Sequence, residues 1–479
     1  MPDTRPIRIE TLIANAASRY QERAALIFGA RRWTYGQLYA EMERRAALLV
    51  AAGLMPGDVV VTAEPVSDDV AIAFLACCRA GLVMLPLSPN LTAAELAPII
   101  VRSGAKRLLR AVSVLHPAVP DLPVLPLALP GVPPDSAPRC PEAHDANAVA
   151  CLRTTSGTTG GVTKLVVSSH HMITWRHATP AWEEAMGGIY YFPQTTFFPL
   201  MDFCTVFGVG GTIILSHATE PGRIEMEIAS HGAASLWTVP AVIRLLVAQS
   251  RPCPAGLRLR VVRTGAAPLA PDVERGVMDR YGARVVQKYA TTEGCSIIGT
   301  PREGAPTGSI GTPYWGVETR LVDIGGRDVS EGETGELIVR SPGVMYGYLD
   351  DAEATAAAVR DGWLWTGDLA RRDTDGFYFL EGRRALRINV GGFKVAPEEV
   401  EAVLMQHPAV REAVALAMPD AGRGEVVRAV IVPVGDAPPI SALRQFCRQR
   451  LANYKVPRQW EFRDVLPRSS LGKVLRHKL

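Results

Sequence analysis

The sequence lacks the cysteine patterns that hold disulfide-rich domains or zinc sites together. Its eight cysteines include no CxxC pair, and none is combined with histidine at a spacing typical of metal ligands. Cys77 and Cys78 are adjacent in an apolar helical pattern, where buried free thiols are expected. We therefore expect no disulfides, no structural zinc and a reducing, cytoplasmic location.

A secretory leader, a membrane span and a strong charge bias are also missing. The first residues, MPDTRPIRIETL, contain no apolar core of the kind found in signal peptides. The most apolar window, 70–87, is interrupted by Arg79 and fits a helix followed by a strand. Because the formal net charge is only +3, neither nucleic acid nor a membrane is expected as a partner. Only the stretch 441–479 is basic, which fits a solvated face or an attraction for phosphate groups.

The patterns that are present indicate an α/β protein with more than one domain. With 479 residues, 48% of them apolar, the chain can bury several cores. Strand and helix patterns alternate over the first 110 residues, which is typical of a parallel sheet covered by helices. The predicted elements there are strands at 58–63 and 82–87, a helix at 69–80, and a helix that starts with the capping box Thr92-Ala-Ala-Glu95 and stops at Gly104.

The rest of the chain divides into a proline-rich stretch, a second α/β region and a tail. The prolines of 120–141 predict an extended surface connection, and 147–383 predicts more α/β structure. The expected elements of that region are a strand at 257–263, a helix at 271–282 and a strand at 284–289. From residue 385 we expect a compact α+β unit with a helix at 397–407, whose one face carries Val400, Val403, Leu404 and His407.

A segment rich in glycine and hydroxyl groups, TTSGTTGGVTK at 154–164, is the first indication of chemistry. Its backbone N–H groups and hydroxyls can surround phosphate oxygens, and its lysine supplies a positive charge. It does not match GxxxxGK[ST], which disfavours a kinase-like function. From this segment alone, a flexible Ser/Thr/Gly loop remains the alternative.

Six further segments follow in order: Gly265-Ala-Ala-Pro-Leu269, Tyr289-Ala-Thr-Thr-Glu293, Gly335-Glu-Leu337, Trp365-Thr-Gly-Asp368, Gly382-Arg383 and Leu471-Gly-Lys473. With the loop, they resemble the acyl-adenylate-forming superfamily of acyl-CoA and aryl-CoA synthetases, peptide-synthetase adenylation domains and beetle luciferases. The resemblance extends from about residue 11 to the end. It implies a large N-terminal domain of layered α/β subdomains, 1–384, and a small mobile α+β C-terminal domain, 385–479.

The resemblance also implies where ATP and Mg²⁺ bind. Expected nucleotide contacts are Thr155, Ser156, Gly157, Thr158, Thr159, Gly160, Lys164, Gly265, Ala266, Ala267, Tyr289, Ala290 and Thr291. Glu293 would hold Mg²⁺, which prefers oxygen ligands, and Thr292 would contact phosphate. Asp368 would accept the ribose hydroxyls, and Arg383 would touch ribose or phosphate. In isolation, each charged residue could equally be a solvated surface group.

Lys473 is the expected catalytic cation. Adenylation brings an anionic carboxylate against an anionic α-phosphate, so a cation that bridges both stabilises the transition state. In relatives a lysine in this Gly-Lys context, on the mobile domain, plays that part. Without the resemblance, Lys473 would be one basic residue among many.

The acid pocket is expected to be mainly apolar and to take an aryl or medium-chain acid. Our alignment places Phe197 where amino-acid-activating relatives carry an aspartate, and a ring cannot pair an ammonium, so the substrate should lack an α-amino group. Thr196 stands where many relatives have histidine. The remaining expected pocket residues are Trp237, Gly265 and Ser296, the last in a predicted turn at 296–299. Core packing is the alternative for each aromatic residue.

The segment NVGGFKVAPEEVE, 389–401, resembles CoA ligases more than peptide synthetases. Gly391, Gly392 and Lys394 would line the thiol channel. CoA is therefore the expected acceptor, with a free-standing acyl carrier protein as the alternative, and a catalytically silent nucleotide-binding scaffold as a third possibility. The chain departs from the family pattern in having Thr163 and one extra residue in the loop, Ala290 for glycine, and Ala385 at the hinge.

Overall fold

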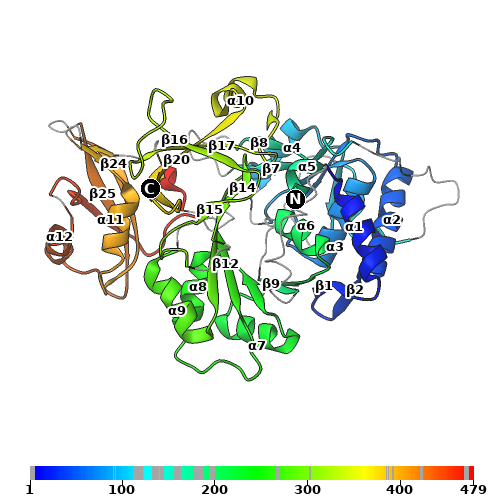
Figure 1. Cartoon of the computed structure of the whole chain (residues 1–479), viewed down its shortest axis with the longest axis horizontal. Coiled ribbons are helices and arrows are strands. Elements are labelled where there is room, and N and C mark those ends of the chain that lie inside the picture. Colours follow the sequence, from blue (N-terminus) through cyan, green and yellow to red (C-terminus); the bar gives the residue numbers. More distant parts are fainter. Residues whose placement is uncertain are drawn as a thin grey trace. The chain divides into compact units, whose positions relative to one another are not determined.

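Figure 1 shows the chain in a computed structural model. The structure describes residues 6–89, 91, 93–111, 122–131, 140, 145–155, 163–175, 188–193, 200–265, 269–300, 304–383, 386, 388–390, 393–420, 424–451, 453–468 and 474–479. They form two compact units, and each unit is described by itself. The first unit comprises the described residues within 1–155, 163–318 and 339–364, and the second unit those within 319–338 and 365–479.

The first sheet of the first unit has the strand order β15-β14-β13-β12-β11-β9-β10-β1-β2. Its strands are β1 (Ala24–Phe28), β2 (Arg31–Thr34), β9 (Ile189–Pro193), β10 (Thr212–Ser216), β11 (Ser235–Trp237), β12 (Val261–Gly265), β13 (Arg284–Thr291), β14 (Cys295–Gly299) and β15 (Thr312–Pro313). From β9 to β13 the neighbouring strands are parallel, so their carboxyl ends meet at one edge. One face packs on α7 (Pro221–His231), α8 (Pro240–Val247) and α9 (Pro271–Tyr281), which lie beside β12 in Figure 1.

The second sheet has the order β18-β8-β7-β4-β3-β5-β6. Its strands are β3 (Val59–Thr62), β4 (Val83–Pro86), β5 (Arg107–Arg110), β6 (Val124–Pro126), β7 (Val149–Thr154), β8 (Leu165–Ser169) and β18 (Gly347–Tyr348). The other helices of this unit are α1 (Ile9–Tyr20), α2 (Tyr35–Ala51), α3 (Asp68–Arg79), α4 (Ala93–Ser103), α5 (His170–Thr174), α6 (Leu200–Gly208) and α10 (Ala352–Ala358). Because β3, β4, β5 and β6 pair in parallel, the predicted parallel sheet of the N-terminal region is confirmed.

The remaining strands form two more sheets among the described residues. One has the order β16-β17-β20-β19, with β21 on β20, and comprises β16 (Glu318–Val322), β17 (Gly335–Arg340), β19 (Val359–Arg360), β20 (Trp363–Arg372) and β21 (Tyr378–Arg383). The other is the predicted α+β tail: β22 (Ile388–Val390), β23 (Phe393–Val395), α11 (Pro397–Leu404), β24 (Val410–Asp420), β25 (Gly424–Pro433), α12 (Ile440–Arg448), β26 (Gln459–Phe462) and η3 (Arg476–Lys478). Its core joins both helices to the sheet.

Three predicted element boundaries around the first sheet are wrong. The strand expected at 257–263 begins only at Val261, because its neighbour β11 begins at Ser235, the partner of Val261. The strand expected at 284–289 continues to Thr291, and the turn expected at 296–299 is strand β14. These two errors have one cause, since β13 and β14 form an antiparallel hairpin that extends both strands.

Two other predictions need correction. The helix expected at 397–407 ends at Leu404, so His407 lies outside it. The residue before Pro408 is disfavoured in a helix, which explains the early end. The proline-rich stretch 120–141 contributes β6, a strand at the edge of the second sheet, where proline is tolerated. The capping residue Thr92 lies outside the described residues, but α4 ends before Gly104 as predicted.

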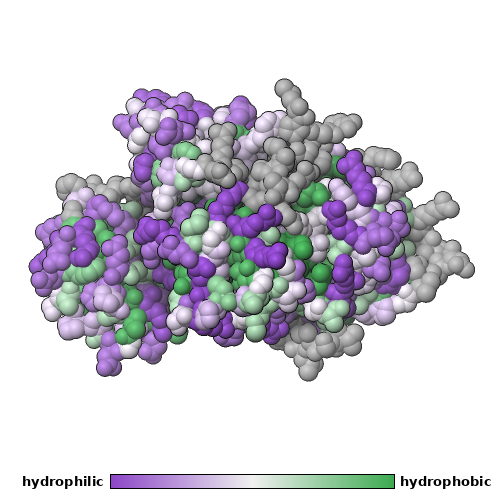
Figure 2. All heavy atoms as spheres, turned by 60° about the horizontal axis from the view of Figure 1, so that its bottom comes forward, coloured by the Kyte–Doolittle hydropathy of each residue, from purple (hydrophilic) through white to green (hydrophobic). Residues whose placement is uncertain are grey.

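No helix in the described part of the chain is both long and apolar enough to span a bilayer. The face shown in Figure 2 is mostly covered by hydrophilic side chains, with hydrophobic ones in small patches between them. Isolated exposed apolar residues of this kind are normal on protein surfaces.

Candidate active site

The hairpin β7–β8 holds both ends of the predicted phosphate loop. Thr154 and Leu165 are cross-strand partners, and the Thr155 N–H donates to the Lys164 carbonyl over 3.0 Å. The Lys164 N–H in turn donates to Thr155 Oγ1 at 3.2 Å. Two predicted contacts, Thr155 and Lys164, therefore lie side by side. The others of this loop, Ser156, Gly157, Thr158, Thr159 and Gly160, lie outside the described residues.

Tyr348 joins the lysine of this loop to the predicted metal ligand. It pairs with Val166 in the second sheet, which places its ring next to the end of the loop. The Lys164 Nζ lies 4.7 Å from the centre of the ring, a cation–π contact. The Tyr348 hydroxyl donates to Glu293 Oε1 over 2.9 Å. Sequence analysis missed Tyr348, because a single tyrosine 184 positions after Lys164 gives no local signal.

Glu293 lies in the tight turn between β13 and β14. The Gly294 N–H donates to Thr291 Oγ1 at 2.8 Å, and Cys295 adopts a positive φ of 57° to close the turn. The Glu293 carbonyl accepts from the Met345 N–H at 2.7 Å. Hydrogen bonds thus fix both the backbone of Glu293, through Met345, and its side chain, through Tyr348. The same hairpin contains three other predicted contacts, Tyr289, Ala290 and Thr292.

Arg153 is a second residue that sequence analysis missed. It immediately precedes Thr154, and its Nη2 lies 3.2 Å from the Cys295 Sγ beside Glu293. Its Nε donates to the Ser168 hydroxyl over 2.8 Å. Arg153 therefore connects the loop hairpin to the turn that carries Glu293. A cation so close to a phosphate loop is the signal that could have indicated it.

The predicted pocket residues that the structure describes, Trp237, Gly265 and Ser296, lie at the carboxyl edge of the first sheet and are buried. Trp237 ends β11 and stacks on Phe192, with ring centres 6.2 Å apart. Gly265 ends β12, where a Cβ atom would lie 2.7 Å from the Lys288 carbonyl oxygen, so the strands meet only because this residue has no side chain. Thr238 and Thr264 are the sequence neighbours of Trp237 and Gly265. Their buried hydroxyls, and that of Ser296, have no hydrogen-bond partner among the described residues. Thr196, Phe197, Ala266 and Ala267 lie outside the described residues.

In the second unit, the two residues predicted to contact ribose form an ion pair. Asp368 and Arg383 are cross-strand partners on β20 and β21, and the Arg383 Nε donates to Asp368 Oδ1 at 2.9 Å. The Asp368 N–H donates to Thr366 Oγ1 at 3.1 Å. The preceding Gly367 N–H donates to Glu336 Oε1 at 3.1 Å, so the carboxylate of Asp368 is presented from a fixed backbone.

The segment that contains Lys473 is held on both sides, although Lys473 itself lies outside the described residues. Arg468 and Val474 form an antiparallel bridge across it. The Arg476 Nη1 donates to the Ala415 carbonyl at 2.7 Å, and Nη2 lies 2.7 Å from Glu401 Oε1. Of the predicted thiol channel, Gly391 and Gly392 are also outside, whereas Lys394 lies in β23 opposite Asn389.

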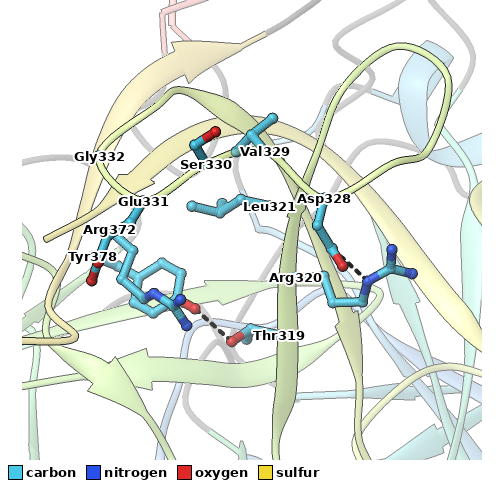
Figure 3. A pocket seen from close by; sticks show the side chains of 10 residues that line it. All are labelled: Thr319, Arg320, Leu321, Asp328, Val329, Ser330, Glu331, Gly332, Arg372 and Tyr378. Carbon is cyan, nitrogen blue, oxygen red and sulfur yellow. Dashed lines mark hydrogen bonds and ion pairs between the residues drawn. The ribbon is translucent and has the colours of Figure 1, made fainter. Parts of the chain in front are cut away.

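A cavity in the second unit contains none of the predicted site residues (Figure 3). Its walls come from β16, the loop between β16 and β17, and the ends of β20 and β21: Thr319, Arg320, Leu321, Asp328, Val329, Ser330, Glu331, Gly332, Arg372 and Tyr378. Its polar groups already bond one another, as in the pair of Thr319 and Tyr378 hydroxyls 2.9 Å apart. We therefore do not place the chemistry there.

Comparison with known proteins identifies the family. The profile of AMP-binding enzymes matches residues 13–349, and that of the AMP-binding enzyme C-terminal domain matches 399–473. The chain belongs to the AMP-binding enzyme family. The predicted membership of the acyl-adenylate-forming superfamily is confirmed.

The curated relatives of this AMP-binding enzyme are acid–thiol ligases. A feruloyl-CoA synthase from an Amycolatopsis species is 33% identical over 468 residues, which covers 91% of this chain and 92% of that protein. A 2-succinylbenzoate–CoA ligase from Bacillus licheniformis is 31% identical and covers 96% of each chain. A fatty acid–[acyl-carrier-protein] ligase from Streptomyces coeruleorubidus is 30% identical, with 98% and 96% covered. These relatives confirm the predicted enzyme class.

Solved structures of similar fold support the same assignment. The o-succinylbenzoate CoA synthetase of Bacillus subtilis, in complex with its acyl-adenylate, matches with a TM-score of 0.88 at 26% identity, covering 98% of this chain and 97% of that one. Its complex with ATP and a magnesium ion matches with a TM-score of 0.87. The predicted α/β fold with a separate C-terminal domain is confirmed.

Proposed function

We propose that this AMP-binding enzyme activates a carboxylic acid with ATP and transfers the acyl group to the thiol of CoA. The observation that carries the proposal is the contact of Tyr348 with both Lys164 and Glu293. Through it, the cation at the end of a phosphate loop and a carboxylate suited to Mg²⁺ come to one place.

The residues of the first unit fit a magnesium–nucleotide. Glu293 offers a carboxylate whose Oε1 is positioned by Tyr348, and carboxylate oxygens are preferred ligands of Mg²⁺. When bound, the ion would neutralise phosphate charge and so favour departure of pyrophosphate. Lys164 would hold the terminal phosphates, and the loop 155–160 would surround them with N–H groups and hydroxyls. The structure of the Bacillus subtilis synthetase in complex with ATP and a magnesium ion supports this.

The second unit would supply the ribose contacts and the catalytic cation. Asp368 would accept the ribose hydroxyls, with Arg383 orienting its carboxylate. Lys473 would bridge the attacking carboxylate and the α-phosphate. The carboxylate oxygen attacks the α-phosphorus and pyrophosphate leaves; a thiolate then attacks the acyl carbon and AMP leaves. We assign the first step to domain 1–384 with Lys473, and the second to a rotated C-terminal domain, 385–479, whose Gly391, Gly392 and Lys394 line the thiol path.

The acid would be an aryl or medium-chain acid without an α-amino group. Phe197 at the aspartate position supports this, as do the aryl acids in the names of the relatives. Trp237, Gly265 and Ser296 would line the pocket with Thr196 and Phe197. We place the enzyme in the cytoplasm on its sequence alone.

A discrete acyl carrier protein is the second candidate acceptor, favoured by the relative that loads such a carrier. Supplying the enzyme with acid, ATP and either free CoA or a purified carrier protein separates the two. If a thioester forms only with the carrier protein, the carrier protein and not CoA is the acceptor. A silent nucleotide-binding scaffold predicts tight ATP binding without turnover of any acid.

The test of the function is acid-dependent ATP–pyrophosphate exchange, since it reports adenylation whatever the acceptor. Lys473→Ala should reduce exchange by about a hundredfold or more, because a fixed charge that stabilises the transition state is lost. Lys478→Ala, which removes an exposed lysine five positions later, is the matched control and should behave like wild type. Full exchange in Lys473→Ala would contradict the role of this lysine, and no exchange by wild type with any acid would contradict the function.

A further inference from the structure

The turn that carries Glu293 contains a backbone conformation that is unusual for its residue. Cys295 adopts a φ of 57°, in the left-handed region that a residue with a side chain rarely enters. Glycine enters this region at no steric cost, yet the adjacent Gly294 does not have a positive φ. The turn therefore places its strained conformation on a residue with a side chain, which indicates that this side chain is needed where it lies.

The Cys295 side chain is buried and lies against Arg153. Cys295 is 2% exposed and packs in the same core as Cys151 of β7. The Arg153 Nη2 donates to the Cys295 Sγ over 3.2 Å. A Cβ atom on Gly343 would lie 3.3 Å from the Cys295 Cβ, so this part of the chain closes over the turn. Cys295 is thus fixed between segments that are far apart in the sequence.

Arg153 is itself fixed within the hairpin that holds the phosphate loop. It pairs with Val166 across β7 and β8, and its Nε donates to the buried Ser168 hydroxyl over 2.8 Å. Because the guanidinium is planar and rigid, the bond at Nε sets the direction in which Nη2 points. Two positions after Arg153, Thr155 begins the predicted loop. Arg153 therefore fixes the position of Cys295 relative to the start of this loop.

The charge of Arg153 strengthens this contact. Burial lowers the pKa of Arg153, but the nearby thiols of Cys295 and Cys151 and the Glu293 carboxylate raise it, and the net direction is upward. The guanidinium is therefore charged at any working pH. Sulfur is a weak acceptor, and a charged donor makes a stronger hydrogen bond than a neutral one.

We propose that Arg153 is a positioning residue, which holds the turn of Glu293 at a fixed place relative to the phosphate loop through its bond to Cys295. The inference rests on the proposed function, in which Glu293 binds Mg²⁺ and the loop binds the phosphates of the same nucleotide. Because Mg²⁺ would have to contact both Glu293 and the phosphates, a displaced turn weakens metal binding first. In this role neither Arg153 nor Cys295 touches a reactant.

The first experiment measures ATP binding by calorimetry with and without Mg²⁺, so that no acid is needed. Arg153→Met should reduce the gain in ATP affinity that Mg²⁺ provides by about tenfold, since one hydrogen bond with a charged donor is lost. ATP binding without Mg²⁺ should stay unchanged. Arg153→Lys keeps the charge but not the fork of donors, and should recover only part of the gain.

A double-mutant cycle tests whether the effect passes through Cys295. Cys295→Ala removes the sulfur and should reduce the gain to a similar extent, and adding Arg153→Met should then change it little. Cys295→Ser keeps an acceptor and should resemble wild type. Losses that multiply in the double variant would show that the two residues act separately, and would overturn the proposal.

Arg107→Met and Cys253→Ala are the matched controls. The Arg107 Nη1 donates to the neighbouring Lys106 carbonyl at 2.9 Å, and the Cys253 Sγ lies 3.7 Å from the Arg280 carbonyl. Both variants should bind ATP like wild type, with and without Mg²⁺. Should Arg153→Met fail to fold, Arg153→Lys and Cys295→Ala carry the same comparison.

Two further results would overturn the proposal. Weaker ATP binding without Mg²⁺ in Arg153→Met, with Cys295→Ala unaffected, would make Arg153 a phosphate contact. Equal losses with and without Mg²⁺ in both variants would indicate a general change in the fold. The proposed function fails in a different way, when wild type binds ATP more tightly with Mg²⁺ but shows no exchange with any acid.

Discussion

Tyr348 is not proposed to react, but it contacts two residues to which we assign a role in the chemistry, Lys164 and Glu293. It touches Lys164 with its ring and Glu293, the carboxylate that we propose to bind Mg²⁺, with its hydroxyl. These two contacts can be removed separately. Phenylalanine retains the ring over Lys164 and loses the bond to Glu293, whereas leucine loses both contacts.

We expect Tyr348→Phe to raise the KM for Mg²⁺ by roughly tenfold, because a hydrogen bond to a charged group contributes about 1.5–3 kcal/mol. The maximal rate at saturating Mg²⁺ should change little, since the hydroxyl orients Glu293 and does not react. Titration of exchange activity with Mg²⁺ measures both quantities. Tyr346→Phe is the matched control, because Tyr346 is exposed and its hydroxyl bonds only the Asn147 carbonyl among the contacts observed. An unchanged KM in Tyr348→Phe would remove Tyr348 from the site.

At the scale of elements, Arg476 shows how a helix and a strand hold the chain next to the segment that contains Lys473. Arg476 reaches both α11, through Glu401, and β24, through the Ala415 carbonyl. Burial raises the pKa of Glu401, and the Arg476 guanidinium opposes that rise. Because Lys473 is three residues before Arg476, this pair anchors the chain just after the segment of Lys473.

Arg476→Ala should therefore lower adenylation by about a hundredfold, as misplacement of a catalytic group does. Formation of the thioester from supplied acyl-adenylate should be largely retained, because we propose that Lys473 acts only in the first step. Measuring the two half-reactions separately tests this. Lys455→Ala breaks an exposed ion pair with Glu399 on the same helix and is the control. Equal losses in both half-reactions would indicate a damaged domain and not a displaced lysine.

Elements also show what could be read from the sequence. Local signals located α3, α4 and α9 within about one residue, because periodicity, caps and Gly282 act within a few positions. The strand β13 was predicted too short, since its last residues pair with β14 and not with a parallel neighbour. The role of Tyr348 could not be predicted, because it depends on pairing between β18 and β8, which are far apart in sequence. The order of the motifs along the sequence was enough to predict the family. The contacts of Tyr348 depend on pairing between distant strands and could not be predicted from local patterns.

For the whole molecule, one buried histidine should make stability depend on pH. His170 is 1% exposed, and its Nδ1 accepts from the Ile9 N–H over 3.3 Å, so the folded protein holds the neutral ring. Burial, aided by nearby Arg8, lowers the pKa of His170 to about 3. An unfolded histidine takes up its proton near pH 6.5. The unfolded state thus binds more protons between these values, and stability should fall as the pH falls from 6.5 toward 3.

His170→Gln should lose less stability over that pH range, with the difference from wild type amounting to roughly a few kcal/mol. Burial also raises the pKa of the neighbouring Glu10, which has the opposite effect and is present in both proteins. Urea denaturation at a series of pH values measures the difference. Parallel curves for the two proteins would show that His170 does not control acid stability.

The pairing of β18 with β8 also bears on how the protein is made. On the side away from β7, strand β8 pairs with β18, Gly347–Tyr348, so nearly 180 residues must be added after β8 before this partner exists. At ~5–20 residues per second, a ribosome needs roughly ten to forty seconds for that length. During this time the nascent chain has an open strand edge, which attracts other strands. Slow or stalled translation before residue 347 should therefore leave a fragment that depends on chaperones to stay unaggregated.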